Sequence, residues 1–145
     1  MTSRPKTVLF ICKGNWFRSQ MAAAIYNQLT GSTAADSVGT YAGAPDEPEG
    51  QILADLFPTP HFFETMARRG MDVRANTTRR LQPAMLGAYD LVVSMAEEPF
   101  VPGFLRHAGD VIWWEIENPK VVDAAVAEDV YARVETLVRG LIERP

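Results

Sequence analysis

The sequence predicts an α/β fold in which a parallel sheet carries helices on both of its faces. Two observations lead to this prediction. Short apolar segments of strand length alternate with segments rich in helix-forming residues along the whole chain. The strand-length segments are continuously apolar and do not alternate with polar residues, which is typical of strands buried on both faces of a parallel sheet.

The chain is expected to begin with a strand, a loop and a helix. Residues 6–12 (KTVLFIC) are β-branched, apolar and aromatic, and they predict the first strand. Residues 18–29 (RSQMAAAIYNQL) are rich in helix formers, and Gly31 is expected to end this helix. Residues 36–41 (DSVGTY) give a weaker strand signal. The segment 44–50 is rich in proline, glycine and acidic residues, so it is expected to be a loop.

The second part of the chain continues the same alternation. Its expected elements are a helix from Thr59-Pro60 (N-cap and first helical residue) to Gly70, a short helix at 83–87, a strand at 89–95, a helix at 97–107 with an irregular start at Pro99 and Pro102, a strand at 110–116, and a helix from Asp123 onward. We find no repeat and no linker, so residues 1–145 are expected to form a single domain.

The composition excludes several function classes. The 145-residue chain has a formal net charge of −4, which offers no electrostatic case for binding nucleic acid. No apolar segment approaches the roughly 20 residues that a membrane-spanning helix needs. The single cysteine excludes an intrachain disulfide and fits a cytoplasmic protein. The two histidines show no metal-ligand spacing, so neither a metal nor another cofactor is expected.

One loop carries the strongest functional signal. Between the first predicted strand and the first predicted helix, the chain has the pattern C-x5-R-S. A loop that enters a helix at the carboxyl end of a parallel strand directs backbone N–H groups and the positive helix pole at one point, which suits a tetrahedral oxyanion such as phosphate or arsenate. The residues expected to bind phosphate are Cys12, Lys13, Gly14, Asn15, Trp16, Phe17, Arg18 and Ser19.

The residue types in this loop predict nucleophilic catalysis. The same local field favours the thiolate form of Cys12, which can attack a bound phosphoryl group. Arg18 can hold two oxygens of that group with its planar guanidinium. Ser19 can donate to the sulfur and assist its departure. Gly14 and Asn15 tolerate the positive φ of a tight loop.

The segment 8–26 (VLFICKGNWFRSQMAAAIY) resembles the signature C-x-G-N-x-C-R-S-P-M-A-E-A of the low-molecular-weight protein tyrosine phosphatases. Gln20, which replaces the proline of that signature, is closer to the related arsenate reductases. The residues that match are Cys12, Gly14, Asn15, Arg18, Ser19, Met21, Ala22 and Ala24. The resemblance implies a four-stranded parallel sheet in the order 2-1-3-4, with the phosphate loop after the first strand.

Weaker similarity to the same superfamily continues along most of the chain. Residues 37–40 (SVGT) resemble a stretch whose serine usually supports the loop asparagine, so Ser37 is expected to support Asn15. Residues 70–73 followed by 78–81, and residues 90–95 followed by Glu97 and Glu98, resemble two further family stretches. Residues 114–119 (WEIENP) fall where the family has the loop that carries its general acid.

Three positions depart from the family pattern. Phe17 stands where the family usually has a second cysteine, so a protective disulfide with Cys12 cannot form. Lys120 stands where eukaryotic members have tyrosines that line the pocket. Asn118 replaces the general-acid aspartate, and an amide has no proton to give to the leaving oxygen. Glu117 is the alternative acid.

Three functions therefore remain open. The first is a phosphomonoesterase that acts on phosphotyrosine or another aryl phosphate through a cysteinyl-phosphate, with Trp16 as a wall for an aromatic ring. The second is an arsenate reductase that uses an external small thiol. The third is a pseudophosphatase that binds phosphorylated ligands and turns them over slowly. The expected partners are phosphorylated small molecules or phosphotyrosine proteins and free oxyanions (phosphate, sulfate, arsenate), with neither nucleic acid nor membrane, and the chain is expected to be a monomer or a weak dimer.

Overall fold

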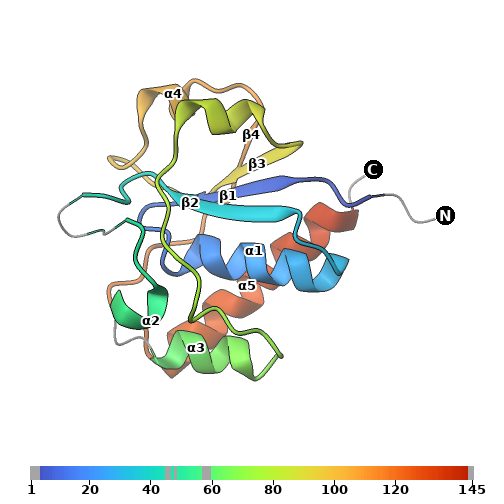
Figure 1. Cartoon of the computed structure of the whole chain (residues 1–145), viewed down its shortest axis with the longest axis vertical. Helices are drawn as coiled ribbons and strands as arrows, with labels where there is room; N and C mark the ends of the chain where they lie inside the picture. Colours follow the sequence, from blue (N-terminus) through green and yellow to red (C-terminus); the bar gives the residue numbers. More distant parts are fainter. Residues whose placement is uncertain (1–3, 45–46, 48, 57–59, 144–145) are drawn as a thin grey trace.

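The computed structural model describes residues 4–44, 47, 49–56 and 60–143. Its centre is a parallel sheet of four strands in the order β2-β1-β3-β4 (Figure 1). The strands are β1 (Val8–Cys12), β2 (Ala35–Gly39), β3 (Leu91–Ser94) and β4 (Val111–Trp113). This arrangement confirms the predicted α/β class and the predicted strand order.

The strand register brings one residue of each strand to the same edge of the sheet. Cys12 pairs with Gly39, and Ile11 pairs with Ser94. Ser94 in turn pairs with Trp113. The carboxyl ends of all four strands therefore lie side by side, and the segments that leave them can meet around the loop that follows β1.

Helices cover both faces of the sheet. The long helices α1 (Arg18–Thr30) and α5 (Ala124–Glu143), with α3 (Pro60–Ala67) beyond them, lie on one side, and α4 (Gly103–Arg106) and η1 (Pro83–Gly87) lie on the other (Figure 1). Alternate side chains of β1 explain this layering. Val8, Phe10 and Cys12 pack with α1, α3 and α5, whereas Leu9 and Ile11 pack with α4 and η1.

Several expected boundaries differ from the observed ones. The helix expected at 97–107 covers only Gly103–Arg106, because Pro99 and Pro102 cannot supply the N–H groups of a helix interior. The last strand ends at Trp113 rather than at residue 116, and the second strand spans 35–39 rather than 36–41. The one-turn helix α2 (Leu53–Leu56) was not expected. Thr59, the expected N-cap of α3, lies outside the described residues.

Candidate active site

The five residues between β1 and α1 form a loop that is fixed to the sheet through its carbonyl groups. The Thr40 N–H donates to the Cys12 carbonyl and the Tyr41 N–H donates to the Lys13 carbonyl, both at 2.8 Å. Gly39 makes this close approach possible, because a Cβ at that position would lie 2.7 Å from the Lys13 carbonyl oxygen. These two hydrogen bonds engage the carbonyl oxygens of Cys12 and Lys13 with the residues that follow β2.

The amino end of α1 has the properties of an anion-binding site. Phe17 occupies the N-cap position without a side-chain hydrogen bond, and the first turn contains no acidic residue. Within the described part of the chain, the amide hydrogens of Gly14, Phe17 and Arg18 have no acceptor. Unpaired amide donors and the positive helix pole both favour a negatively charged group. This part of the loop can therefore hold a tetrahedral oxyanion.

Asn15 fixes the turn of the loop. Its φ of 62° lies in the left-handed region, which asparagine adopts more readily than most residues. Its Oδ1 accepts a 2.8 Å hydrogen bond from the Arg79 N–H, and its Nδ2 donates a 2.8 Å hydrogen bond to Ser19 Oγ. Gln20 Nε2 donates to the Asn15 carbonyl at 3.1 Å. Gly14, in contrast, does not have a positive φ. Of the two residues expected to tolerate a positive φ, only Asn15 has one.

The expected support of Asn15 by Ser37 is not observed, because these hydrogen bonds involve other residues. Ser37 pairs with Phe10, two residues before the Gly39–Cys12 pair at the strand ends. Ser37 lines a surface pocket with Gln20 and Arg79, and within the described part of the chain no hydrogen bond joins it to Asn15. The support comes instead from the backbone of Arg79, which reaches the loop from a distant part of the sequence.

The donors around Asn15 determine the direction of the hydrogen bond to the nucleophile. The Arg79 N–H can only donate, so Asn15 must turn its Oδ1 toward it and its Nδ2 toward Ser19. Ser19 Oγ accepts from Nδ2, which leaves its own hydrogen free to be donated to Cys12 Sγ, 3.0 Å away, when the sulfur is a thiolate. The Asn15 N–H donates to the same sulfur at 3.3 Å. Both bonds are stronger when the sulfur is a thiolate, so the arrangement suits a nucleophile.

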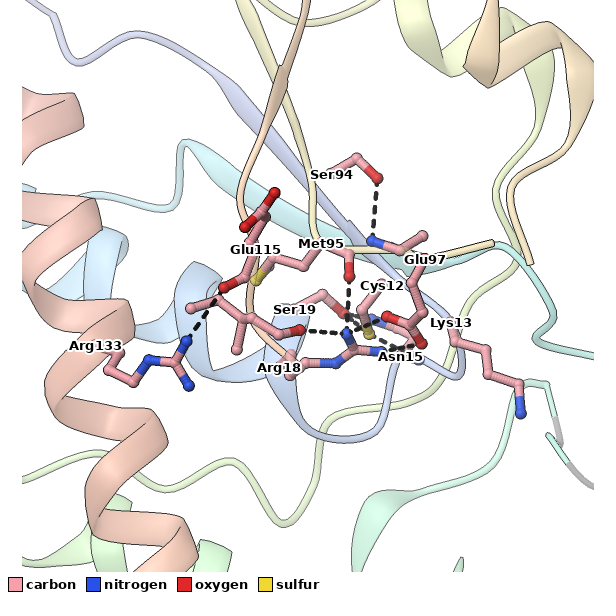
Figure 2. A network of polar contacts seen from close by, with 12 residues as sticks. Cys12, Lys13, Asn15, Arg18, Ser19, Ser94, Met95, Glu97, Glu115 and Arg133 are labelled. Carbon is pink, nitrogen blue, oxygen red and sulfur yellow. Dashed lines mark hydrogen bonds and ion pairs between the residues drawn. The ribbon is translucent and has the colours of Figure 1, made fainter. Parts of the chain in front are cut away.

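The Arg18 guanidinium is buried beside this sulfur, with an exposed fraction of 2%. Its Nη1 donates to the carbonyls of Met95 and Ile116, both at 2.8 Å, and to Glu97 Oε2 at 2.7 Å. Figure 2 shows the guanidinium between the phosphate loop and residues 95–97, which follow β3. Arg18 therefore links the phosphate loop to two other segments that leave the same edge of the sheet.

The segment that was expected to carry the general acid lies against Arg18. Its Ile116 carbonyl accepts the Arg18 bond, and the Glu115 carbonyl accepts a 3.2 Å bond from Arg133 of α5 (Figure 2). Glu117 and Asn118 directly follow Ile116, and both side chains are exposed. The structure thus brings the backbone of this segment to the phosphate loop, and it leaves both candidate side chains in contact with solvent.

An acidic residue that the sequence analysis did not single out also reaches the loop. Glu47 is 7% exposed and forms an ion pair with Lys13, Oε1 to Nζ, at 3.3 Å. A Cβ on Gly14 would collide with the Glu47 carboxylate and lie 2.7 Å from the Trp16 ring, so glycine at this position leaves room for both. Lys13 Nζ also lies 4.3 Å from the centre of the Phe100 ring. The acid-rich composition of segment 44–50 was the only sequence signal for this contact.

The two aromatic residues of the loop differ in burial. Phe17 is 2% exposed and packs edge-on against Phe62 of α3, with ring centres 5.1 Å apart. This apolar packing attaches the loop to α3. Trp16 is half-buried and stacks on Phe17 at 5.7 Å. The part of Trp16 that remains exposed is available to contact a substrate.

Neither a metal centre nor a membrane span is found in the part of the chain that the structure describes. No group of three or more His, Cys, Asp or Glu side chains is arranged to hold a metal ion. Across the same residues, no helix combines the length and the apolar character needed to cross a membrane.

Comparison with known proteins agrees with this site. The family model described as low molecular weight phosphotyrosine protein phosphatase matches residues 7–144. A protein from Ralstonia solanacearum, described as a probable low molecular weight protein-tyrosine-phosphatase EpsP, is 26% identical over 150 residues, which cover 96% of this chain and 95% of that protein.

Two solved structures have the same fold. Wzb of Vibrio vulnificus, in complex with benzylphosphonate, superposes with a TM-score of 0.78 and 17% identity, covering 97% of this chain and 99% of its own. An arsenate reductase in a phosphate-binding state superposes with a TM-score of 0.70 and 25% identity, covering 94% and 96%. The chain belongs to the low molecular weight phosphotyrosine protein phosphatase family, and it is a hydrolase of that type.

Proposed function

We propose that this chain hydrolyses aryl phosphates, phosphotyrosine among them, through a cysteinyl-phosphate on Cys12. The observation that carries this proposal is that Cys12 Sγ accepts a hydrogen bond from the Asn15 N–H and lies 3.0 Å from Ser19 Oγ, which can donate to it as a thiolate, at the amino end of α1. A sulfur with two donors, beside unpaired amides and a buried guanidinium, is suited to be a nucleophile next to a bound dianion.

The reaction has two displacement steps. In the first step, the Cys12 thiolate forms a bond to phosphorus while the bond from phosphorus to the aryl oxygen breaks. In the second step, a water oxygen attacks phosphorus and the P–S bond breaks, which releases inorganic phosphate and restores the thiolate. Arg18 and the loop amides stabilise the charge on the transferred oxygens in both steps, and the Ser19 hydrogen stabilises the departing sulfur.

The leaving oxygen needs a proton unless it departs as a stable phenolate. Asn118 cannot supply that proton, so we assign this role to Glu117, which directly follows the residue bonded to Arg18. When the second step occurs, the ionised Glu117 carboxylate can accept a proton from the attacking water.

Three aromatic residues near the loop support an aryl substrate. Trp16 belongs to the loop, Phe100 lies against Lys13, and Tyr41 packs edge-on against Phe100 with ring centres 5.0 Å apart. Relatives bind benzylphosphonate and phosphate, which is consistent with an aromatic phosphate ester at this site.

Because Cys12 must remain reduced to act, we further propose a reducing compartment such as the cytoplasm.

Asn118 favours a second candidate, a module that binds phosphorylated ligands with little turnover. The arsenate reductase among the structural relatives favours a third, in which Cys12 attacks arsenate and an external small thiol supplies the reducing equivalents. The chain contains no second cysteine that could do so.

The three candidates can be separated in one set of assays. The purified protein is assayed with p-nitrophenyl phosphate and phosphotyrosine, and separately with arsenate plus glutathione or another small thiol. Hydrolysis that is abolished by Cys12→Ser supports the proposal. Arsenate reduction without hydrolysis would identify a reductase, and phosphate binding without either reaction would identify a binding module.

A further inference from the structure

Glu97 makes a charged contact with the catalytic loop that the proposed reaction does not use. Its Oε2 lies 2.7 Å from Arg18 Nη1, and its Oε1 lies 3.4 Å from Arg18 Nη2. We propose that Glu97 is a positioning residue that orients the Arg18 guanidinium for the transition state. This inference rests on the proposed function, since it assigns a role at the same site.

The hydrogen bonds divide the guanidinium into two parts. Nη1 carries two hydrogens and faces three acceptors, namely Glu97 and the carbonyls of Met95 and Ile116. Nη2 has only the longer contact to Glu97, and no acceptor is found for the Nε hydrogen among the described residues. The Nε hydrogen and the second Nη2 hydrogen lie on one edge of the plane, and this edge matches two oxygens of a tetrahedral anion.

The burial of Arg18 explains why a carboxylate is needed. A guanidinium that is 2% exposed has lost most of its hydration, and two carbonyl oxygens alone do not neutralise its charge. Glu97 supplies that charge from a side chain that is 39% exposed, so it keeps part of its own hydration. The guanidinium is therefore already oriented before an anion binds, which is the condition for effective transition-state stabilisation.

The segment that carries Glu97 is itself held in place. Ser94 Oγ accepts a 3.2 Å hydrogen bond from the Ala96 N–H, which closes a tight turn at the end of β3 (Figure 2). The Met95 N–H donates to the Ile11 carbonyl at 2.7 Å, so this turn is attached to the strand that leads to Cys12. Glu97 is thus placed by the sheet itself.

The next residue offers a matched control. Glu98 is also a glutamate on the same segment, but it forms an ion pair with Arg106, at 2.7 Å and 2.9 Å, on the surface. Glu97→Gln and Glu98→Gln remove the same charge from adjacent positions. Only the first variant changes a group that contacts the phosphate loop.

The test compares a transition-state analogue with a ground-state ligand. Orthovanadate forms a five-coordinate adduct with a thiolate and resembles the transition state, whereas inorganic phosphate resembles the product. Affinity for each is measured by the protection of Cys12 from iodoacetamide, which requires no turnover. We expect Glu97→Gln to weaken vanadate binding about 10-fold and phosphate binding at most about 2-fold, because orientation matters most where charge develops. Glu98→Gln should change neither affinity.

Kinetics and stability provide the second readout. With p-nitrophenyl phosphate, Glu97→Gln should lower kcat about 10-fold and leave KM within about 2-fold.

Glu97→Asp should change the ratio of vanadate to phosphate affinity in the same direction, because its carboxylate is one methylene too short to reach Nη1. An unchanged ratio in both variants would overturn the inference, even if thermal unfolding showed a loss of stability. If Glu97→Gln changes the ratio of vanadate to phosphate affinity as expected, but the parent hydrolyses no substrate, the proposed function is rejected and the inference stands.

Discussion

Cys12 Sγ lies 3.0 Å from Ser19 Oγ, and Ser19 Oγ accepts a hydrogen bond from Asn15 Nδ2, which leaves the Ser19 hydroxyl hydrogen free to be donated to a Cys12 thiolate. Such a bond stabilises a thiolate both before attack and when it departs from phosphorus. The rate of the second displacement step should therefore depend on Ser19.

Ser19→Ala should lower kcat by about 10- to 100-fold, the value of one hydrogen bond to a charged group. The loss should fall on hydrolysis of the cysteinyl-phosphate, so p-nitrophenolate should appear in a burst that is followed by a slow steady state. Stopped-flow absorbance would detect the burst, and mass spectrometry would detect the phosphorylated Cys12. An unchanged kcat without a burst would contradict the role of this hydrogen bond.

Arg18 should contribute to folding as well as to binding. Arg18→Ala removes the common donor of Glu97 and two carbonyls, which leaves buried acceptors and a carboxylate without their partner. We expect loss of most oxyanion binding and a loss of about 3–5 kcal/mol in the free energy of unfolding. Arg18→Lys should recover part of the stability but not the binding, because a point charge lacks the planar fork.

Urea unfolding and phosphate titration would measure the two effects separately. Arg74→Ala is the matched control, because Arg74 forms its ion pair with Asp72 on the surface, where solvent screens the two charges, and its loss should have little effect on stability. Phosphate affinity in Arg18→Lys equal to that of the parent would show that bidentate binding is not required.

The assignment of Glu117 as the general acid should make its effect depend on the leaving group. Glu117→Gln should lower phosphotyrosine turnover by about 10²- to 10⁴-fold and remove the fall in rate at high pH, with less effect on p-nitrophenyl phosphate, whose phenolate departs without a proton. Asn118→Asp should then gain little, whereas a large gain in phosphotyrosine turnover would show that the parent lacks a general acid. Steady-state pH profiles of both variants would identify the acid. If neither variant changes turnover while phosphate still binds, the catalytic interpretations are wrong.

Trp16 should select for flat aromatic substrates. It is half-buried and stacks on Phe17, so its exposed part forms a wall next to the bound phosphate. Trp16→Ala should lower kcat/KM for aryl phosphates by about 2- to 12-fold more than for alkyl phosphates, which corresponds to a stacking contribution of about 0.5–1.5 kcal/mol. An equal loss of kcat/KM for aryl and alkyl phosphates would show that Trp16 contributes only to packing.

A cluster between α3 and α5 should make stability depend on acid pH. Hydrogen bonds from Arg69, and next from Thr65, lower the pKa of Glu128 to about 2. Because this pKa is depressed on folding, the stabilisation is present above the unfolded value of about 4.3 and is lost as the pH falls toward 2. The Glu128 side chain is 37% exposed, so screening limits the contribution to about 1 kcal/mol.

Glu128→Gln should therefore lower Tm at pH 7 and lose less stability than the parent between about pH 4.3 and 2. Thermal unfolding followed by circular dichroism across this range would measure the difference. Parallel curves for the parent and the variant would show that the cluster does not contribute.

The local pattern of the sequence was sufficient for the fold class and for the loop. Continuous apolar segments predicted the buried parallel strands, and the placement of Cys12 and Arg18 between strand and helix predicted an oxyanion site. These features depend on interactions between residues close in sequence, such as helix formation by residues 18–29 and burial along residues 6–12. Exact boundaries were less certain because prolines and strand edges respond to their surroundings.

Only the tertiary structure determined which distant groups complete the site. Arg79 supports Asn15, Glu97 binds Arg18 and Glu47 reaches Gly14, and none of these residues is near its partner in sequence. Ser37 was expected to support the loop from the family resemblance, but the hydrogen bonds of the Asn15 side chain go to Ser19, Gln20 and Arg79. Hydrogen bonds and ion pairs of this kind depend on distances of a few tenths of an ångström across packed segments. The spacing of residues along the sequence does not give the distances between such distant residues. The packing of the four strand ends at one edge of the sheet sets them.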